Sequence, residues 1–289
     1  MRTLSIVTLT AVALNVVSVS AQTTSVNIQI SRPRPLQAAL DELERQLGVP
    51  INYEDPRFAC SEELQDITAQ SQTPAQKAAN PNARIVVPKG GTLTLASAVP
   101  AATPRTPDAL PLITQLRVQH EAKAYAGRFS VTQMGGVYTV QPVSTRNSAC
   151  VWEPAVPAME TRLSLPTQRR DATETINLIL NAVSKQINAK VGLGTIPIHS
   201  FINRTVMVGS ANQPANATLM QVLQEISAQE SAIPPSQPLY SYHLLYDPGV
   251  KYYLLHIGAV PPRQIQQSSP GSVVPAPPLQ GLPGGKKVN

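Results

Sequence analysis

The 289-residue chain has little charge, few aromatic residues and almost no cysteine. Charged residues make up 14% of it, aromatic residues 4%, and there are two cysteines. Lysine and arginine do not cluster beside aromatic side chains, so the basic footprint of a nucleic-acid-binding surface is missing. Beyond the first 20 residues, no apolar run approaches the roughly 20 residues that a membrane span requires. We therefore expect no nucleic-acid partner and no membrane segment after the N-terminal one.

Catalytic and metal-binding signatures are also missing. The chain contains no G-x-S-x-G motif. Lys89-Gly90-Gly91 lacks the remainder of a phosphate-binding loop and predicts a hairpin turn between strands at 85–87 and 93–95. The two cysteines have no neighbouring histidine, so they lack the ligand spacing of a zinc site. The sequence favours a protein that is not an enzyme and holds no metal or cofactor.

Four histidines occur, at positions 120, 199, 243 and 256. If two strands pair across the turn at 247–250, His243 lies opposite Leu254 and His256 opposite Ser241, which makes the two histidines diagonal neighbours. No third metal ligand accompanies them, so an ordinary half-exposed strand face is the simpler interpretation. A secreted hydrolase with a nucleophile beside His120 or His199 stays as the least favoured alternative.

The first 21 residues have the pattern of a secretory signal peptide. A positive start at Arg2 precedes an apolar stretch at 4–19, and Ser20-Ala21 supplies small residues for cleavage before Gln22. This places the mature chain outside the cytoplasm, either periplasmic or secreted. The formal net charge is +6, but removing Arg2 and three cations of the C-terminal tail leaves +2 for residues 22–260.

An even number of cysteines in an exported chain suggests a disulfide. We predict a bridge between Cys60 and Cys150, with two free buried thiols as the alternative.

The chain contains two copies of one pattern, β-α-β-β-α-β-β, at 22–146 and 160–260. The predicted fold class is therefore α+β, with two small sandwich modules in tandem. Residues 147–159 read as a linker, 59–83 and 96–107 as insertions in the first copy, and a turn of helix is expected at 61–67. The tail, 261–289, is rich in proline and glycine without an aromatic residue, which is typical of disorder.

In the first copy, alternation from Ser25 predicts a strand, and a helix follows from Pro35 to a stop at Gly48. Further strands are expected at 51–53 and 84–87, and a second helix at 108–123. A hairpin around Gly135-Gly136 would pair Val131 with Val140.

The second copy repeats this order. Strands are expected at 161–165 and 205–208, and the latter is matched with 84–87. One helix is capped by Asp171 and a second by Asn216. The closing hairpin spans 240–257.

Tyrosines cluster in that last hairpin. Tyrosine is enriched at interfaces because it combines an apolar ring with a polar end. The alternative is packing in the core, which we favour for Tyr242 and Tyr253, whereas Tyr246 and Tyr252 are expected to be exposed. The candidate binding residues are Tyr240, Tyr242, Tyr246, Tyr252 and Tyr253.

The order of elements resembles the secretin and TonB short N-terminal domain (STN). The residues that carry the resemblance are Leu36, Ala39, Leu40, Leu43, Gly48 and Tyr53, with a looser match around Ile176, Leu180 and 216–226. The resemblance implies a module that docks envelope proteins, possessing no catalytic residues. No secretin ring or receptor barrel follows in this chain.

From these patterns we expect an exported interaction module of the cell envelope. It would dock a partner, such as a protein of a secretin or outer-membrane receptor system, through a sheet edge or the tyrosine-rich hairpin. A module that binds a small ligand or a polysaccharide is the alternative.

Overall fold

The computed structural model describes residues 23–100, 108–230 and 239–262. It confirms the predicted α+β class, with strands and helices in a repeated order. The predicted signal peptide and residues 263–289 of the predicted tail lie outside the described residues.

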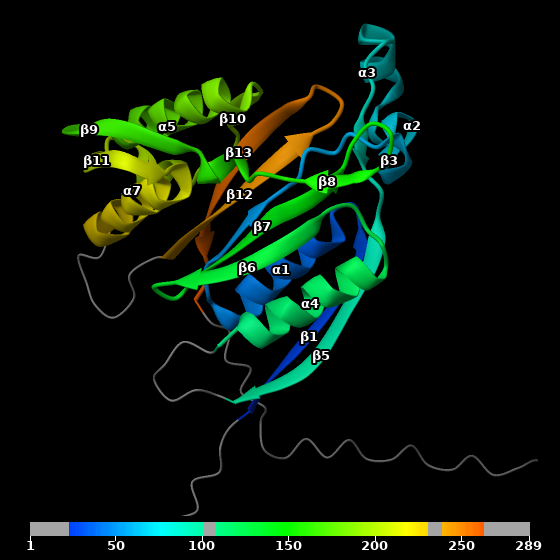
Figure 1. The fold of residues 1–289 in the computed structure, drawn as a ribbon, viewed down its shortest axis with the longest axis horizontal. Helices are drawn as coiled ribbons and strands as arrows, with labels where there is room; N and C mark the ends of the chain where they lie inside the picture. The colour runs from blue at the N-terminus through cyan, green and yellow to red at the C-terminus, as the bar shows by residue number, and fades with distance from the viewer. Residues whose placement is uncertain (1–22, 101–107, 231–238, 263–289) are drawn as a thin grey trace, which may run out of the picture.

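Module 1, residues 23–146, is a sandwich with two helices between two sheets (Figure 1). Strand β1 pairs antiparallel with β5, while β2, β7 and β6 lie together in the other sheet. Helices α1 and α4 fill the space between, and their apolar side chains form one buried core with both sheets. The elements are β1 (Thr23–Arg32), α1 (Pro35–Leu47), β2 (Ile51–Glu54), β5 (Gly91–Pro100), α4 (Leu110–Ala122), β6 (Arg128–Met134) and β7 (Val137–Arg146).

Module 2, residues 162–260, repeats this arrangement. Strand β9 pairs antiparallel with β11, and β10, β13 and β12 form the second sheet. Helices α5 and α7 contribute to a separate core. The elements are β9 (Arg162–Asp171), α5 (Ala172–Ile187), β10 (Lys190–Leu193), α6 (Ile198–Phe201), β11 (Thr205–Pro214), α7 (Ala215–Glu230), β12 (Leu239–Asp247) and β13 (Tyr252–Val260).

Local sequence explains the element boundaries. Helix α1 has proline in its first turn and ends at Gly48, whose φ of 65° is the left-handed conformation that glycine adopts easily. Asp171 caps α5 by accepting the N–H groups of Thr173 and Glu174. The β6–β7 hairpin pairs Val131 with Val140, as predicted.

The two modules share one sheet. Strand β12 of module 2 runs parallel to β2 of module 1, so the strand order is β10-β13-β12-β2-β7-β6. Short strand β8 (Trp152–Pro154) pairs with the far end of β7. Neighbouring residues of β12 point to opposite faces: Leu244 belongs to the core of module 2, and Leu245 packs against that of module 1. The helices of the two modules therefore cover opposite faces of the shared sheet (Figure 1).

The long insertion of module 1 differs from its prediction. It contains η1 (Ser61–Glu63), β3 (Leu64–Asp66), α2 (Thr68–Ser71), α3 (Pro74–Ala79) and β4 (Val86–Pro88). The helical turn expected at 61–67 covers only η1, because the next three residues pair as β3 with β4.

That pairing also corrects two further predictions. Lys89-Gly90-Gly91 is not a hairpin turn, since the strands on either side of it pair with different partners, β4 with β3 and β5 with β1. The counterpart of the strand at 205–208 is therefore β5, not residues 84–87. Asn216 is not an N-cap, because α7 already begins at Ala215.

The connection between the modules is structured. It contains β8, which extends the sheet, and η2 (Ala158–Glu160), whose Ala158 and Met159 are buried. None of the described helices has the length and apolar character needed to cross a membrane.

Candidate functional site at an open sheet edge

The junction between β2 and β12 is extended by side chains. Main-chain register covers only two pairs, His243 with Tyr53 and Leu244 with Glu54. On either side, a side chain takes over the role of a strand carbonyl. Asn52 Oδ1 accepts the N–H of Tyr242 at 3.0 Å, and Asp55 Oδ2 accepts the N–H of Tyr246 at 3.0 Å.

Asp55 is the centre of the polar contacts at this junction. It is fully buried, and Arg34 Nε donates to its Oδ2 at 2.7 Å. Arg34 also donates to the carbonyl of Tyr246 at 2.5 Å, and the Tyr53 hydroxyl donates to Asp55 Oδ1 at 2.9 Å. Burial raises the pKa of Asp55, and the charge of Arg34 opposes that rise. These contacts tie the start of α1 and the end of β2 to β12.

Two buried glutamates complete the junction. Glu44 accepts the N–H of Ile51 at 2.8 Å and the hydroxyl of Ser241 at 3.0 Å, and burial raises its pKa to about 7. Glu54 accepts the N–H groups of Ala158 and Met159, and burial raises its pKa to about 8. All four junction carboxylate and amide side chains are occupied by protein groups, so we assign the junction a structural role.

Four of the five candidate tyrosines are in the core. Tyr240, Tyr242, Tyr246 and Tyr253 are at most 5% exposed. The expected packing of Tyr242 and Tyr253 is confirmed, and the expected exposure of Tyr246 is wrong, because its ring packs on Phe58 and Tyr253. Only Tyr252 is partly exposed, with Lys190 Nζ 5.4 Å from its ring centre. The folded tyrosine-rich hairpin therefore offers little aromatic surface to a partner.

Two of the histidines are neighbours across the β12–β13 hairpin. His243 lies directly opposite His256, not opposite Leu254, because the loop between the strands has four residues. His243 Nδ1 is 3.3 Å from Asp41, and His256 Nδ1 is 3.0 Å from the hydroxyl of Thr195. His120 is buried in module 1, where its Nε2 lies 2.9 Å from the carbonyl of Ala126.

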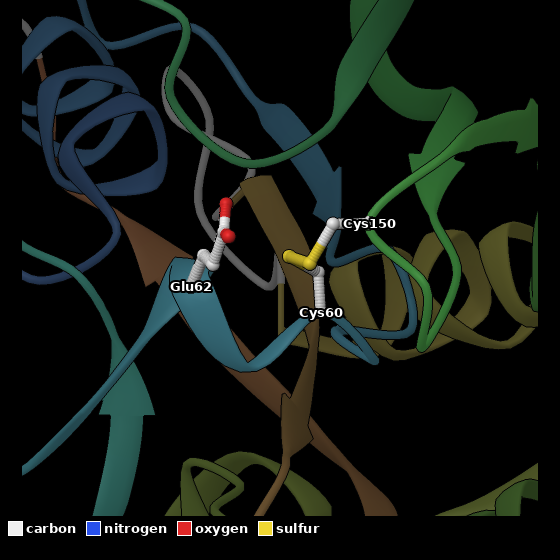
Figure 2. Close-up of side chains that lie close together, drawn as sticks. All are labelled: Cys60, Glu62 and Cys150. Atoms are coloured by element: carbon white, nitrogen blue, oxygen red, sulfur yellow. A yellow bond between two sulfur atoms is a disulfide. The ribbon is translucent and has the colours of Figure 1, made fainter.

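Among the described residues, one group of three potential metal ligands lies close together: Cys60, Glu62 and Cys150. Figure 2 shows that the two cysteines form a disulfide, with Glu62 nearby. A sulfur in a disulfide is not a thiolate ligand, so this group is a cross-link rather than a metal site. The predicted Cys60–Cys150 bridge is confirmed.

Side chains from helices, or from the residues just after a helix, block the outer edges of several strands. On β1, the Gln46 side chain accepts the N–H of Asn27 at 3.2 Å and donates to its carbonyl at 2.8 Å. On β5, the Tyr125 hydroxyl does the same for Thr92, at 2.8 and 3.3 Å. A blocked residue interrupts the row of free groups that a foreign strand would need.

Module 2 uses the same device. The Ser184 hydroxyl accepts the N–H of Val191 in β10 at 2.9 Å and donates to its carbonyl at 3.3 Å. On β11, Glu225 accepts the N–H of Met207, and Gln229 donates to the carbonyl of Thr205, both at 2.7 Å. Strand β9 contains Pro166 and two register shifts against β11, which are further protections of an edge.

Strand β6 is the exception among the described outer strands of four or more residues. Met134 and Val137 flank a two-residue turn and form the first hydrogen-bonded pair, so pairs alternate from there. Gln133 and Val131 therefore direct their N–H and C=O groups away from β7. No described side chain bonds to those main-chain groups. Only at the start of the strand does Glu121 accept the N–H of Phe129, at 3.5 Å.

The open edge is also accessible. Thr132, Gln133 and Met134 are exposed, and Met134 is 78% exposed. The sequence patterns indicate sheet edges as docking sites, but they do not single out this strand. The blocking residues 46, 125 and 184 lie 19, 33 and 7 positions from the residues they block, and only the last separation is local.

Comparisons with known proteins return nothing for this chain: no family model, curated protein or solved structure matches it.

Proposed function

We propose that this protein is an exported, non-enzymatic docking protein of the cell envelope, and that its β6 edge accepts an extended segment of a partner. The observation that carries the proposal is the difference between edges. Strands β1, β10 and β11 are each blocked by a helix side chain and β5 by Tyr125, which follows α4, whereas no described side chain bonds to the outward main-chain groups of Val131 and Gln133 in β6. Strand addition uses such groups for affinity.

Other features support an envelope location. The N-terminal 21 residues have the signal-peptide pattern, and the Cys60–Cys150 disulfide is compatible with an oxidising compartment. The resemblance to the STN domain suggests a partner within a secretin or outer-membrane receptor system. The tail would then act as a tether or a second contact.

The test compares two substitutions at one position. Gln133→Pro removes an N–H that faces away from β7 and places a ring on the edge, while Gln133→Ala removes the same side chain but keeps the N–H. Each variant, the natural chain and a form ending at residue 262 are used to capture proteins from cross-linked envelope extract. We expect a partner that the natural chain, Gln133→Ala and the shortened form all recover and Gln133→Pro loses.

Equal recovery by Gln133→Pro would contradict docking at β6, and recovery lost only with the shortened form would move the function to the tail. Circular dichroism and thermal unfolding of both variants confirm that the compared proteins are folded.

A second candidate function, binding of a small apolar ligand, is favoured by one groove. It has a volume of about 250 Å³ between β7 and α7, and Val137, Met134 and Met220 line it together with polar groups such as Asn52. Met220→Trp would fill the groove. Loss of an apolar dye's fluorescence in that variant, with partner capture unchanged, would support this function independently of docking.

A further inference from the structure

The repeated fold identifies the counterpart of the open edge. Ile51 of β2 and Val191 of β10 hold equivalent places in the two modules. Ile51 is paired with Tyr138 and Val191 with Tyr253, so these two tyrosines are also equivalent. Across their hairpins, Tyr138 faces Gln133 and Tyr253 faces Tyr246. Gln133 and Val131 of β6 therefore correspond to Tyr246 and, two residues earlier, Leu244 of β12.

In module 2 this edge is already occupied. The occupant is β2 of module 1, and it runs parallel to β12. The pairing of β2 with β12 therefore shows one way in which an extended segment binds this edge of the module.

In the pairing of β2 with β12, one residue at the C-terminal end of β2 bonds to two main-chain groups of β12. Asp55 donates its own N–H to the carbonyl of Leu244 at 2.8 Å, and its side chain accepts the N–H of Tyr246 at 3.0 Å. A single aspartate therefore satisfies two successive outward-facing groups of the edge strand. The equivalent groups of β6, the carbonyl of Val131 and the N–H of Gln133, have no partner among the described residues.

We infer that the partner segment runs parallel to β6 and carries an aspartate or asparagine whose N–H donates to Val131 and whose side chain accepts the N–H of Gln133. This inference rests on the proposed function, since it specifies the occupant of the same edge. The N–H of Phe129, which corresponds to Tyr242, is already directed at Glu121, so the partner needs no counterpart of Asn52.

A second copy of the chain fits this requirement poorly. The strand equivalent to β2 is β10, and there Thr195 stands at the position of Asp55. The Thr195 hydroxyl is engaged with His256, and Ser184 blocks Val191. We therefore assign the edge to a segment of another protein.

The probe for this inference is a peptide with the sequence of residues 49–56, which contains β2 and Asp55. It is titrated into the ¹⁵N-labelled mature chain and followed by NMR. We expect saturable shifts of the Val131 and Gln133 amides and none in Gln133→Pro. Peptide with Asp55→Asn should bind comparably, and peptide with Asp55→Ala about tenfold more weakly, as expected for one lost hydrogen bond.

Orientation is read from a nitroxide on the N-terminus of the peptide. In the parallel arrangement it broadens signals near Arg128, at the start of β6, and spares those near Met134. Broadening at Met134, equal binding of the Asp55→Ala peptide, or no saturable shift at millimolar peptide would overturn the inference. So would self-association of the chain that Gln133→Pro abolishes and Gln133→Ala keeps.

These outcomes are separable from those of the proposed function. Partner capture that depends on the Gln133 N–H, together with failure of the peptide, would retain docking at β6 and reject the parallel aspartate-bearing segment. Capture that does not depend on this N–H would reject both.

Discussion

Glu44 and Ser184 occupy the same position in the two modules. Each is on the first helix of its module and lies seven residues before the strand residue whose N–H it accepts, Ile51 at 2.8 Å and Val191 at 2.9 Å. The glutamate stands where β12 covers the edge, and its second oxygen accepts the hydroxyl of Ser241 from the other module. The serine stands at the outer edge and blocks it. The same position therefore helps to join two strands in module 1 and blocks an outer strand edge in module 2.

Replacing Glu44 with glutamine should reduce the pH dependence of stability. Burial raises the pKa of Glu44 from 4.5 to about 7, so the folded chain keeps a proton that the unfolded chain releases. The contribution of this site to the free energy of unfolding therefore falls by about 3 kcal/mol as the pH rises from about 4.5 to 7. Glutamine can still accept from Ile51 and donate to Ser241. The free energy of unfolding, measured in urea from pH 4.5 to 8, checks this.

The informative quantity is the difference between the natural chain and Glu44→Gln at each pH. His120 and His256, whose pKa values are lowered by burial, act in the opposite sense in both proteins and cancel in that difference. A difference that does not change with pH would contradict the titration of Glu44.

Replacing Asp55 with asparagine should destabilise the chain by about 3 kcal/mol, because it leaves the charge of Arg34 without its buried partner. The Arg34 side chain is only 18% exposed, so water replaces little of the lost interaction. Chemical denaturation at pH 7 measures the change. The exposed Glu62→Gln variant is the control and should stay within about 0.5 kcal/mol of the natural chain. A similar cost for both variants would show that the Arg34–Asp55 pair is not important.

Removing the disulfide with Cys60→Ala and Cys150→Ala should lower the free energy of unfolding by about 4 kcal/mol. The bridge joins residues 90 positions apart, and closing a loop of that length restricts the unfolded chain. Limited proteolysis of the double variant should cut first between residues 56 and 90, since this insertion contributes few residues to either core. The natural chain treated with a dithiol should behave like the variant. First cleavage inside α5 or α7 would contradict this account.

Replacing Ser184 with alanine should open the edge of β10. Val191 loses the group that both accepts its N–H and donates to its carbonyl, at a cost of about 1 kcal/mol. We expect the variant to associate at concentrations where the natural chain does not, as measured by sedimentation velocity. Ser148→Ala, at an exposed position, is the matched control. Unchanged sedimentation of Ser184→Ala would show that this hydroxyl does not protect the edge.

Sequence patterns predicted the local part of the fold. Helix α1 could be placed because its apolar spacing, Pro35 and Gly48 act within a few residues of one another. The second hairpin shows where local rules end. The register predicted for its two strands is wrong because the loop between them lies one residue later than expected, at 248–251. Asp247 accepts the N–H groups of Gly249 and Val250, and Lys251 takes a positive φ of 56°, which together place the loop there.

The junction between β2 and β12 could not be predicted from the sequence for a different reason. Asn52 and Tyr242 are 190 residues apart, and nothing in either segment marks the other as its partner. The same holds for the open edge, because an edge is recognised only when the side chains that block the other edges are seen in place.

The shared sheet can be completed only late in biosynthesis. The chain is made from its N-terminus, so β2 and its acidic side chains exist long before residues 239–247, which cover them. During that interval module 1 has two uncovered edges instead of one, and Asp55 lacks the N–H of Tyr246. A newly made chain is therefore most open to wrong pairings, or to a chaperone, in the time between completion of β7 and arrival of β12.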